Sequence, residues 1–177
     1  MSKNKRKKKR KKLRIFLLAI GLLLLFSFIF IMIGAYVLKI NTNAIIIKGN
    51  NIINDELILK ETGLKDYPNF FLTSSNKIEK KLKQNSFIKS VTVNKNLFFQ
   101  ITINIKENKP LFIREDTNMI VLDNSKEIKN DSSLELNIPY LVNYVPDTKY
   151  SELIEKLKKI DYSLIKKVSQ IVYSPTK

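Results

Sequence analysis

The longest uninterrupted run of apolar residues lies near the start of the chain. Residues 15–38 carry no charged side chain and read IFLLAIGLLLLFSFIFIMIGAYVL. A helix of this length measures about 36 Å, and the hydrocarbon core of a bilayer is about 30 Å thick. The pattern therefore predicts one transmembrane helix over residues 15–38. We expect its lipid-facing anchor positions to include Ile15, Leu18, Leu25, Phe30 and Leu38.

The pattern over residues 39–110 predicts a small α+β domain. Its expected elements are a strand at 44–48, a helix from about 55 to 63, a helix from about 77 to 84, and strands at 87–95 and 97–105. The last strand has the clearest signal, because five apolar residues from Leu97 to Ile105 alternate with polar ones. Helices packed on one face of the sheet would bury these surfaces in two layers.

Local signals mark the ends of these elements. Asn54 is suited to cap the first helix and Gly63 to end it. Asn76 followed by Glu79 resembles a capping box for the second helix. Gly49 begins a turn of the kind that needs a positive φ.

Residues 111–177 predict a second domain that is mostly β and incomplete. The expected elements are strands at 111–114 and 119–123, an extended segment at 138–142, a helix at 150–160 and a final alternation at 168–173. Ser151 is the expected cap of the helix, and Glu155 is expected opposite Lys159. The predicted organisation is a basic tail at 1–14, a span at 15–38, and domains at 39–110 and 111–177.

The charge distribution indicates the orientation of the span. Ten of the first 14 residues are Lys or Arg, whereas the rest of the chain has 22 basic and 16 acidic residues. Basic residues beside a span stay in the cytoplasm, where they also contact anionic lipid headgroups. We therefore expect residues 1–14 in the cytoplasm and both domains on the other side of the membrane.

A cleaved signal peptide and a nucleic-acid-binding tail fit this basic and then apolar beginning less well than an anchor does. A cleaved signal peptide has a shorter apolar core that ends in a small-residue site, and this segment has neither feature. A nucleic-acid-binding protein would mix basic and aromatic residues on a folded surface. Here the basic cluster abuts the span, so we expect no nucleic-acid partner.

Composition argues against an enzyme. The chain has no His and no Cys, which removes the commonest general base, a common nucleophile and two metal ligands. A Ser/Lys dyad remains open, but it needs a desolvated lysine, and no external Lys lies in a long apolar run. Four acidic residues could suggest a Ca²⁺ site, but they lack EF-hand spacing: Asp116, Asp123, Glu127 and Asp131. We predict no catalytic, cofactor, metal or small-molecule site.

The candidate partner-binding residues are aromatic. Phe98 falls on the polar face of its predicted strand, where an exposed aromatic residue can serve an interface. Tyr140, Tyr144 and Tyr150 lie near prolines, a combination found both at interfaces and at ordinary domain edges. The strand at 97–105 could accept a partner strand at its edge, although its apolar face is more simply core.

A series of short segments resembles the FtsQ/DivIB family of bacterial cell-division proteins. The similar segments, in chain order, are 47–52, 54–58, 68–71, 87–93, 100–110, 121–123 and 138–141. The sequence departs from the family pattern at three positions. Asn108 replaces an Arg in the glu-arg-x-pro signature, Phe98 replaces a frequent Pro, and Lys126 replaces a usual Gly.

The resemblance implies a POTRA domain with the order β-α-α-β-β, followed by a β-domain. It implies a non-catalytic scaffold or regulator at the division septum, with FtsB/DivIC-like and FtsL-like membrane proteins as partners. The family usually continues past a segment like 171–175 into further strands, so we expect the second domain described by this sequence to be incomplete. The alternative function is a POTRA-type chaperone or export module that binds extended polypeptides at a strand edge.

Overall fold

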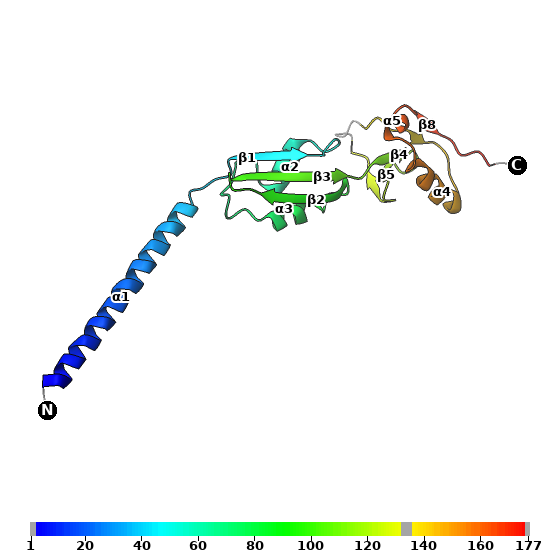
Figure 1. Cartoon of the computed structure of the whole chain (residues 1–177). Helices are drawn as coiled ribbons and strands as arrows, with labels where there is room; N and C mark the ends of the chain where they lie inside the picture. Colours follow the sequence, from blue (N-terminus) through cyan, green and yellow to red (C-terminus); the bar gives the residue numbers. More distant parts are fainter. Residues whose placement is uncertain (1–2, 132–135, 176–177) are drawn as a thin grey trace.

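The structure, a computed structural model, describes residues 3–131 and 136–175, and the side chains of those residues from 12 onward. An N-terminal helix leads into two domains that lie one after the other (Figure 1). The elements are α1 (Lys3–Val37), β1 (Ala44–Lys48), α2 (Asp55–Thr62), α3 (Ser75–Leu82), β2 (Ile88–Lys95), β3 (Gln100–Glu107), β4 (Pro110–Arg114), β5 (Met119–Leu122), β6 (Glu127–Lys129), β7 (Tyr140–Leu141), α4 (Asp147–Leu157), α5 (Tyr162–Ile165) and β8 (Gln170–Ile171).

The N-terminal helix extends through the basic tail as well as the apolar segment. Its part from Lys12 to Val37 is long and apolar enough to cross a membrane, and its side chains are exposed. Ile15, Leu18, Leu25 and Phe30 lie on this part, whereas Leu38 follows the last helical residue. Their contact with lipid stays a prediction. The side chains of residues 1–11, which include most of the basic tail, lie outside the described part.

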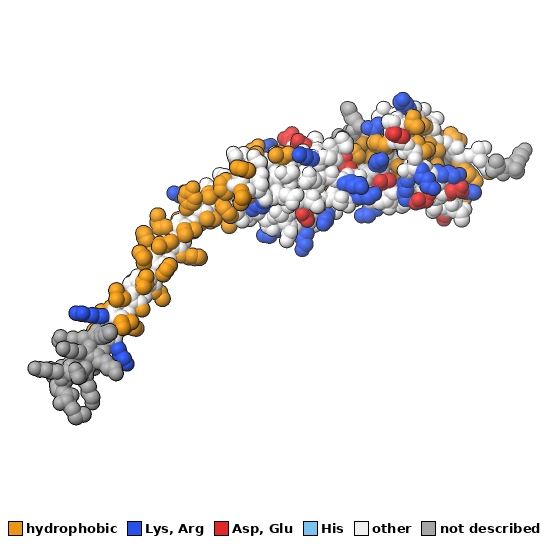
Figure 2. Space-filling model, viewed as in Figure 1, with side chains coloured by type: hydrophobic (Ala, Val, Ile, Leu, Met, Phe, Trp, Pro, Cys, Tyr) orange, Lys and Arg blue, Asp and Glu red, His pale blue; other side chains and the backbone are white. Residues whose placement is uncertain are grey.

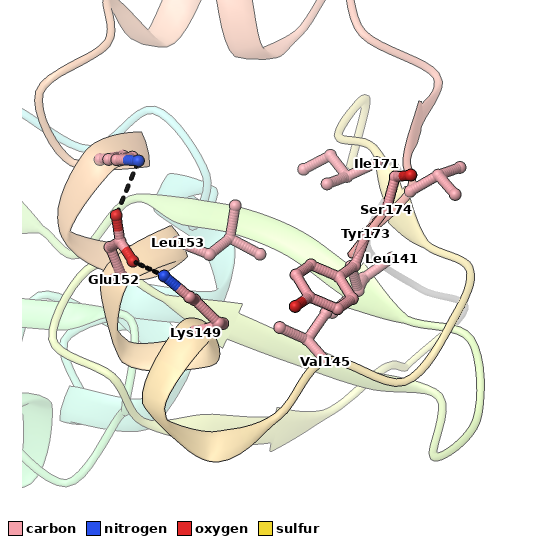
Figure 3. Close-up of a pocket in the computed structure, with 10 residues that line it drawn as sticks. Leu141, Val145, Lys149, Glu152, Leu153, Ile171, Tyr173 and Ser174 are labelled. Atoms are coloured by element: carbon pink, nitrogen blue, oxygen red, sulfur yellow. Dashed lines mark hydrogen bonds and ion pairs between the residues drawn. The ribbon is translucent and has the colours of Figure 1, made fainter. Parts of the chain in front are cut away.

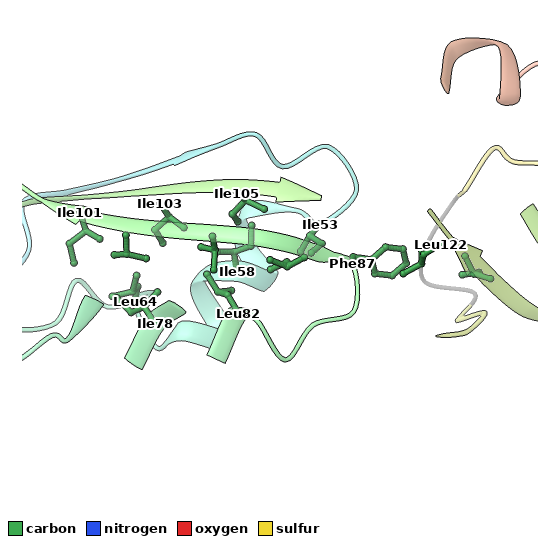
Figure 4. Close-up of a cluster of buried hydrophobic side chains, with 14 of the residues drawn as sticks. Ile53, Ile58, Leu64, Ile78, Leu82, Phe87, Ile101, Ile103, Ile105 and Leu122 are labelled. Carbon is green, nitrogen blue, oxygen red and sulfur yellow. The ribbon is translucent and has the colours of Figure 1, made fainter. Parts of the chain in front are cut away.

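The first domain has the predicted β-α-α-β-β order. Among the described residues, its sheet has the order β1-β3-β2, with β1 parallel and β2 antiparallel to the central β3. Figure 4 shows α2 and α3 against one face of this sheet. The side chains of Ile58 and Leu82 meet Ile101 and Ile103 there, and all four are fully buried. This packing explains the strict alternation along β3.

The first helix is capped as predicted, but the second is not. The Asn54 side chain accepts a hydrogen bond from Leu57 N at 2.8 Å, and Gly63 ends α2 with φ of 74°. In α3 the cap is Ser74 rather than Asn76, so the helix begins earlier than expected. Glu79 does not close a capping box. Its carboxylate accepts from Val93 N at 2.9 Å and so fastens α3 to β2.

The loop between β2 and β3 is longer than the one residue that separates the predicted strands at 87–95 and 97–105. Strand β3 begins at Gln100, and Leu97 is 94% exposed instead of lying on the buried face. The cause is Asn96, whose side-chain oxygen accepts from Phe98 N at 2.9 Å and Gln100 N at 3.1 Å. This side chain stabilises a turn, a common use of Asn, and the turn interrupts the alternation.

The second domain contains a sheet with the order β6-β5-β4-β7-β8 among the described residues. Strands β4 and β5 correspond to the two predicted strands and pair as an antiparallel hairpin, and β7 and β8 add in parallel. The prediction missed β6 and α5. Helix α4 begins at Asp147 rather than Tyr150, so Ser151 lies inside the helix and does not cap it. Glu155 pairs with Lys158 instead of the expected Lys159.

The two sheets share a continuous apolar core. Figure 4 shows Phe87 of the first domain beside Leu122 of the second, and both belong to one buried cluster. Only Asn108 and Lys109 separate β3 from β4, and the buried Asn108 donates to Ser86 O at 2.8 Å. A second cluster lies between α4, α5 and the sheet around Phe112 and Ile154.

Candidate interaction surface

A groove opens between α4 and the segment that contains β8. Its volume is about 260 Å³, and Figure 3 shows apolar side chains lining it from both sides. Leu153 comes from the helix, Leu141 and Ile171 from the sheet, and Val172 and Tyr173 from the segment after β8. An apolar groove of this kind can receive apolar side chains of another polypeptide.

Three charged residues of α4 form one rim of the groove. Glu152 lies between Lys149 at 3.1 Å and Lys156 at 2.8 Å. Hydrogen bonds from Lys156 and Lys149 lower the pKa of Glu152 to about 2. Glu152 is therefore ionised at physiological pH, and the charged residues of this rim can orient a polar segment above the apolar floor.

The segment after β8 is extended, and the Asn143 side chain forms hydrogen bonds with its backbone of the kind that a neighbouring strand would form. The Asn143 side chain donates to Tyr173 O at 2.7 Å and accepts from Tyr173 N at 2.8 Å. Among the described residues β8 is the last strand on its side of the sheet, paired with β7 alone. Its outer side carries backbone groups of the kind that pair with an added strand.

A polar cluster lies on the neighbouring surface. Arg114 binds Asp116 in a two-pronged pair, with Nη2 to Oδ2 at 2.7 Å, and reaches Glu127 at 3.2 Å. Tyr150 OH donates to Glu127 at 2.8 Å, and its ring packs edge-on against Phe112. The hydrogen bond from Arg114 lowers the pKa of Asp116, and burial raises the pKa of Tyr150. These groups therefore hold one another in place.

The predicted aromatic residues do not form one surface. Tyr144 is 76% exposed and lines a second hollow with Tyr150, beside the polar cluster. Tyr150 is half-buried and holds α4 to the sheet. Tyr140 is partly exposed on β7 and lines neither hollow. Phe98 lies in the β2–β3 hairpin at the far end of the first domain, beside the end of α1.

The groove residues were missed by sequence reasoning for a physical reason. The spacing of Lys149, Glu152 and Lys156 is visible in the sequence and marks one helix face. The other wall comes from a parallel strand pairing between segments about 30 residues apart. No local sequence pattern indicates that these two segments pair.

The described part of the chain shows no arrangement suited to metal binding or to Ser/Lys catalysis. It contains no group of three His, Cys, Asp or Glu residues able to hold a metal ion. Burial lowers the pKa of Lys95, the property that a Ser/Lys dyad requires. Its ammonium group, however, donates to the carbonyl oxygens of Phe70 and Thr73 and lies 4.1 Å from the Phe70 ring centre. Lys95 therefore joins β2 to a loop.

Comparison with known proteins identifies the first domain. Residues 40–108 match the family model of the POTRA domain, FtsQ-type. The cell division protein DivIB of Staphylococcus pseudintermedius is 33% identical over 136 residues, which cover 74% of this chain and 45% of that protein. DivIB of Bacillus subtilis is 30% identical over 145 residues, covering 80% and 54%. DivIB of Bacillus anthracis is 29% identical over 140 residues, covering 77% and 52%. The chain spans about half the length of these curated relatives.

Proposed function

The chain belongs to the FtsQ/DivIB family, and from this membership we propose that it is a single-pass membrane protein of the bacterial cell-division machinery. It acts as a scaffold or regulator during septum formation. The observation that carries the proposal is the FtsQ-type POTRA domain, which begins at residue 40, directly after a helix able to cross a membrane.

The orientation follows from charge. The basic residues before Lys12 and the apolar helix after it favour a cytoplasmic N-terminus. The POTRA domain and the second domain then face the extracytoplasmic space, near other division proteins of the same membrane. An enzymatic role has no support in the polar cluster or at Lys95.

The proposed partners are FtsB/DivIC-like and FtsL-like membrane proteins. We assign their docking to the α4–β8 groove, because it combines an apolar floor, a charged rim and a strand edge that carries no partner among the described residues. An extended segment with alternating apolar residues fits these features, since its backbone can pair with the strand while its side chains enter the groove.

Co-purification of the full chain with the partner candidates in detergent tests the docking surface. Val172→Asp places a charge on an exposed apolar wall of the groove and should reduce partner recovery. Leu164→Asp is the matched control, because Leu164 is similarly exposed but lies on α5 outside the groove. Equal recovery with both variants would reject this surface.

Depletion of the protein from living cells distinguishes the proposed role in division from the alternative role in export. Cells that lose the protein should elongate without septa while exported proteins still reach their destinations. Normal septation combined with failed export would favour the chaperone function instead.

A further inference from the structure

The end of the POTRA domain beside α1 carries an exposed apolar surface. It is formed by two loops, residues 67–73 and 96–99, which we call the apolar rim. Four of its side chains are strongly exposed: Leu97 at 94%, Phe98 at 73%, Leu72 at 70% and Phe71 at 49%. Neither loop contains a charged residue, in a chain that is 27% charged. In Figure 2 the hydrophobic side chains of α1 continue onto this end of the folded part.

The apolar rim is fastened directly to the end of the span. The Asn69 side chain donates to the carbonyl oxygen of Val37, the last residue of α1, at 3.0 Å. Phe70 N donates to Ile40 O at 2.9 Å, and Asn43 N donates to Phe99 O at 2.8 Å. Both loops therefore lie within a few residues of the point where α1 ends, on the side of the domain that faces the span.

Packing beneath the apolar rim keeps its outer side chains outside the core. The rings of Phe70, Phe71 and Phe99 meet edge-on, with centres 5.4–6.0 Å apart. Lys95 donates to the carbonyl oxygens of Phe70 and Thr73 and holds the first loop against β2. Phe70 is buried on the core side of this arrangement, whereas Leu72, Leu97 and Phe98 are exposed.

We propose that the apolar rim inserts into the interface of the bilayer that α1 crosses. Large exposed apolar patches mark surfaces that bind a protein or a membrane, and Phe and Leu side chains bury at the boundary between headgroups and acyl chains. The span ends at Val37, so its end and the attached rim reach this level together. The inserted rim fixes the tilt of the POTRA domain and thereby the direction in which the α4–β8 groove faces. This inference rests on the proposed membrane span.

Tryptophan fluorescence of the full chain in lipid vesicles tests the proposal. The chain has no Trp, so each single substitution gives one signal. Phe98→Trp reports on the rim, Phe26→Trp on the middle of the span, and Tyr144→Trp on an equally exposed site in the second domain. The vesicles contain phosphatidylcholine and phosphatidylglycerol, with acyl chains brominated both close to the headgroup and near the chain ends, so that a tryptophan at either depth is quenched.

The proposal predicts a blue shift and strong quenching for Phe98→Trp, and neither effect for Tyr144→Trp. Adding Leu97→Asp to Phe98→Trp should reverse the shift without unfolding, because Leu97 makes almost no contact. Quenched Phe26→Trp with unquenched Phe98→Trp would overturn this inference alone. Unquenched Phe26→Trp would overturn the proposed span. A blue shift of Phe98→Trp that arises only when a partner protein is added would show that a protein, and not lipid, covers the rim.

Discussion

Glu107 gives a structural reason for the acidic residue of the signature segment. Its two carboxylate oxygens accept hydrogen bonds from the backbone N–H groups of Asn51, Ile52 and Ile53, at 2.8–2.9 Å. The loop after β1 is thus fastened to the end of β3. The resemblance at residues 100–110 located this Glu, but the sequence could not show its partners, because they lie more than 50 residues away.

Glu107→Gln should lower the free energy of unfolding by about 1–3 kcal/mol, because an amide replaces a charged acceptor and turns one oxygen into a donor. Urea unfolding of the full chain in micelles measures the change. Glu56→Gln is the control, since Glu56 forms an exposed ion pair with Lys65, and its loss should cost little. Equal losses in both variants would contradict the assigned role.

Gly49 and Gly63 both have positive φ but differ in their surroundings. A Cβ at Gly49 would lie 2.1 Å from Ile105 O, whereas one at Gly63 would meet no atom within 4 Å. Gly63→Ala should therefore cost about 1–2 kcal/mol from backbone strain alone. Gly49→Ala should cost clearly more, and the same urea experiment compares the two. A similar loss for both would show that the close approach to β3 has no energetic consequence.

The elements could be predicted where burial follows a simple period. Val91 and Val93 on β2 and Ile101 to Ile105 on β3 alternate as expected, because a single face of the sheet is covered. The residues at which helices and strands begin and end were harder to predict. Asn96 and Ser74 determine where β3 and α3 begin, and each competes in the sequence with a neighbouring residue of similar chemistry. The short β6 and α5 depend on contacts with distant segments and have no period of their own.

Tyr162, on α5, gives a prediction about pH. Burial raises its pKa to about 12, above the usual value of about 10. The folded state disfavours the phenolate, so the stability contribution is complete below pH 10 and is lost as the pH rises towards 12. Tyr162→Phe should lose less stability over this range than the unmodified chain.

The ring of Tyr162 also faces the ammonium groups of Lys109 and Lys166. Phe keeps that ring, so any deprotonation of the lysines affects both proteins alike. Urea midpoints at pH 9 and near pH 11.5 measure the difference, and identical alkaline losses would contradict the burial of the hydroxyl.

In the molecule as a whole, a continuous apolar core joins the two domains. Phe87 and Ile88 at the end of the first sheet belong to the same buried cluster as Ile120, Leu122 and Ile138 of the second domain. The sequence patterns did not predict this shared core, because the residues at the junction lack a pattern that indicates tertiary packing. This shared core joins the POTRA domain, whose tilt we propose the apolar rim fixes, to the domain that carries the α4–β8 groove.

Phe87→Ala should destabilise both domains together, by about 3–5 kcal/mol, because it opens a cavity at the junction. Native-state hydrogen exchange measures this at the amides of β2 and β5. Phe98→Ala is the control, since the exposed Phe98 contributes little to folding. Faster exchange in β2 with unchanged exchange in β5 would show that the domains unfold independently.

The central claim is that the chain works at the site of division, and localisation in living cells tests it most directly. A fluorescent protein fused to the N-terminus is expressed in dividing cells depleted of the native copy, with membrane fractionation as the control for insertion. We expect a band of fluorescence at mid-cell. Fluorescence spread evenly over the whole membrane, from a fusion that fractionates with the membrane, would contradict a role at the division site.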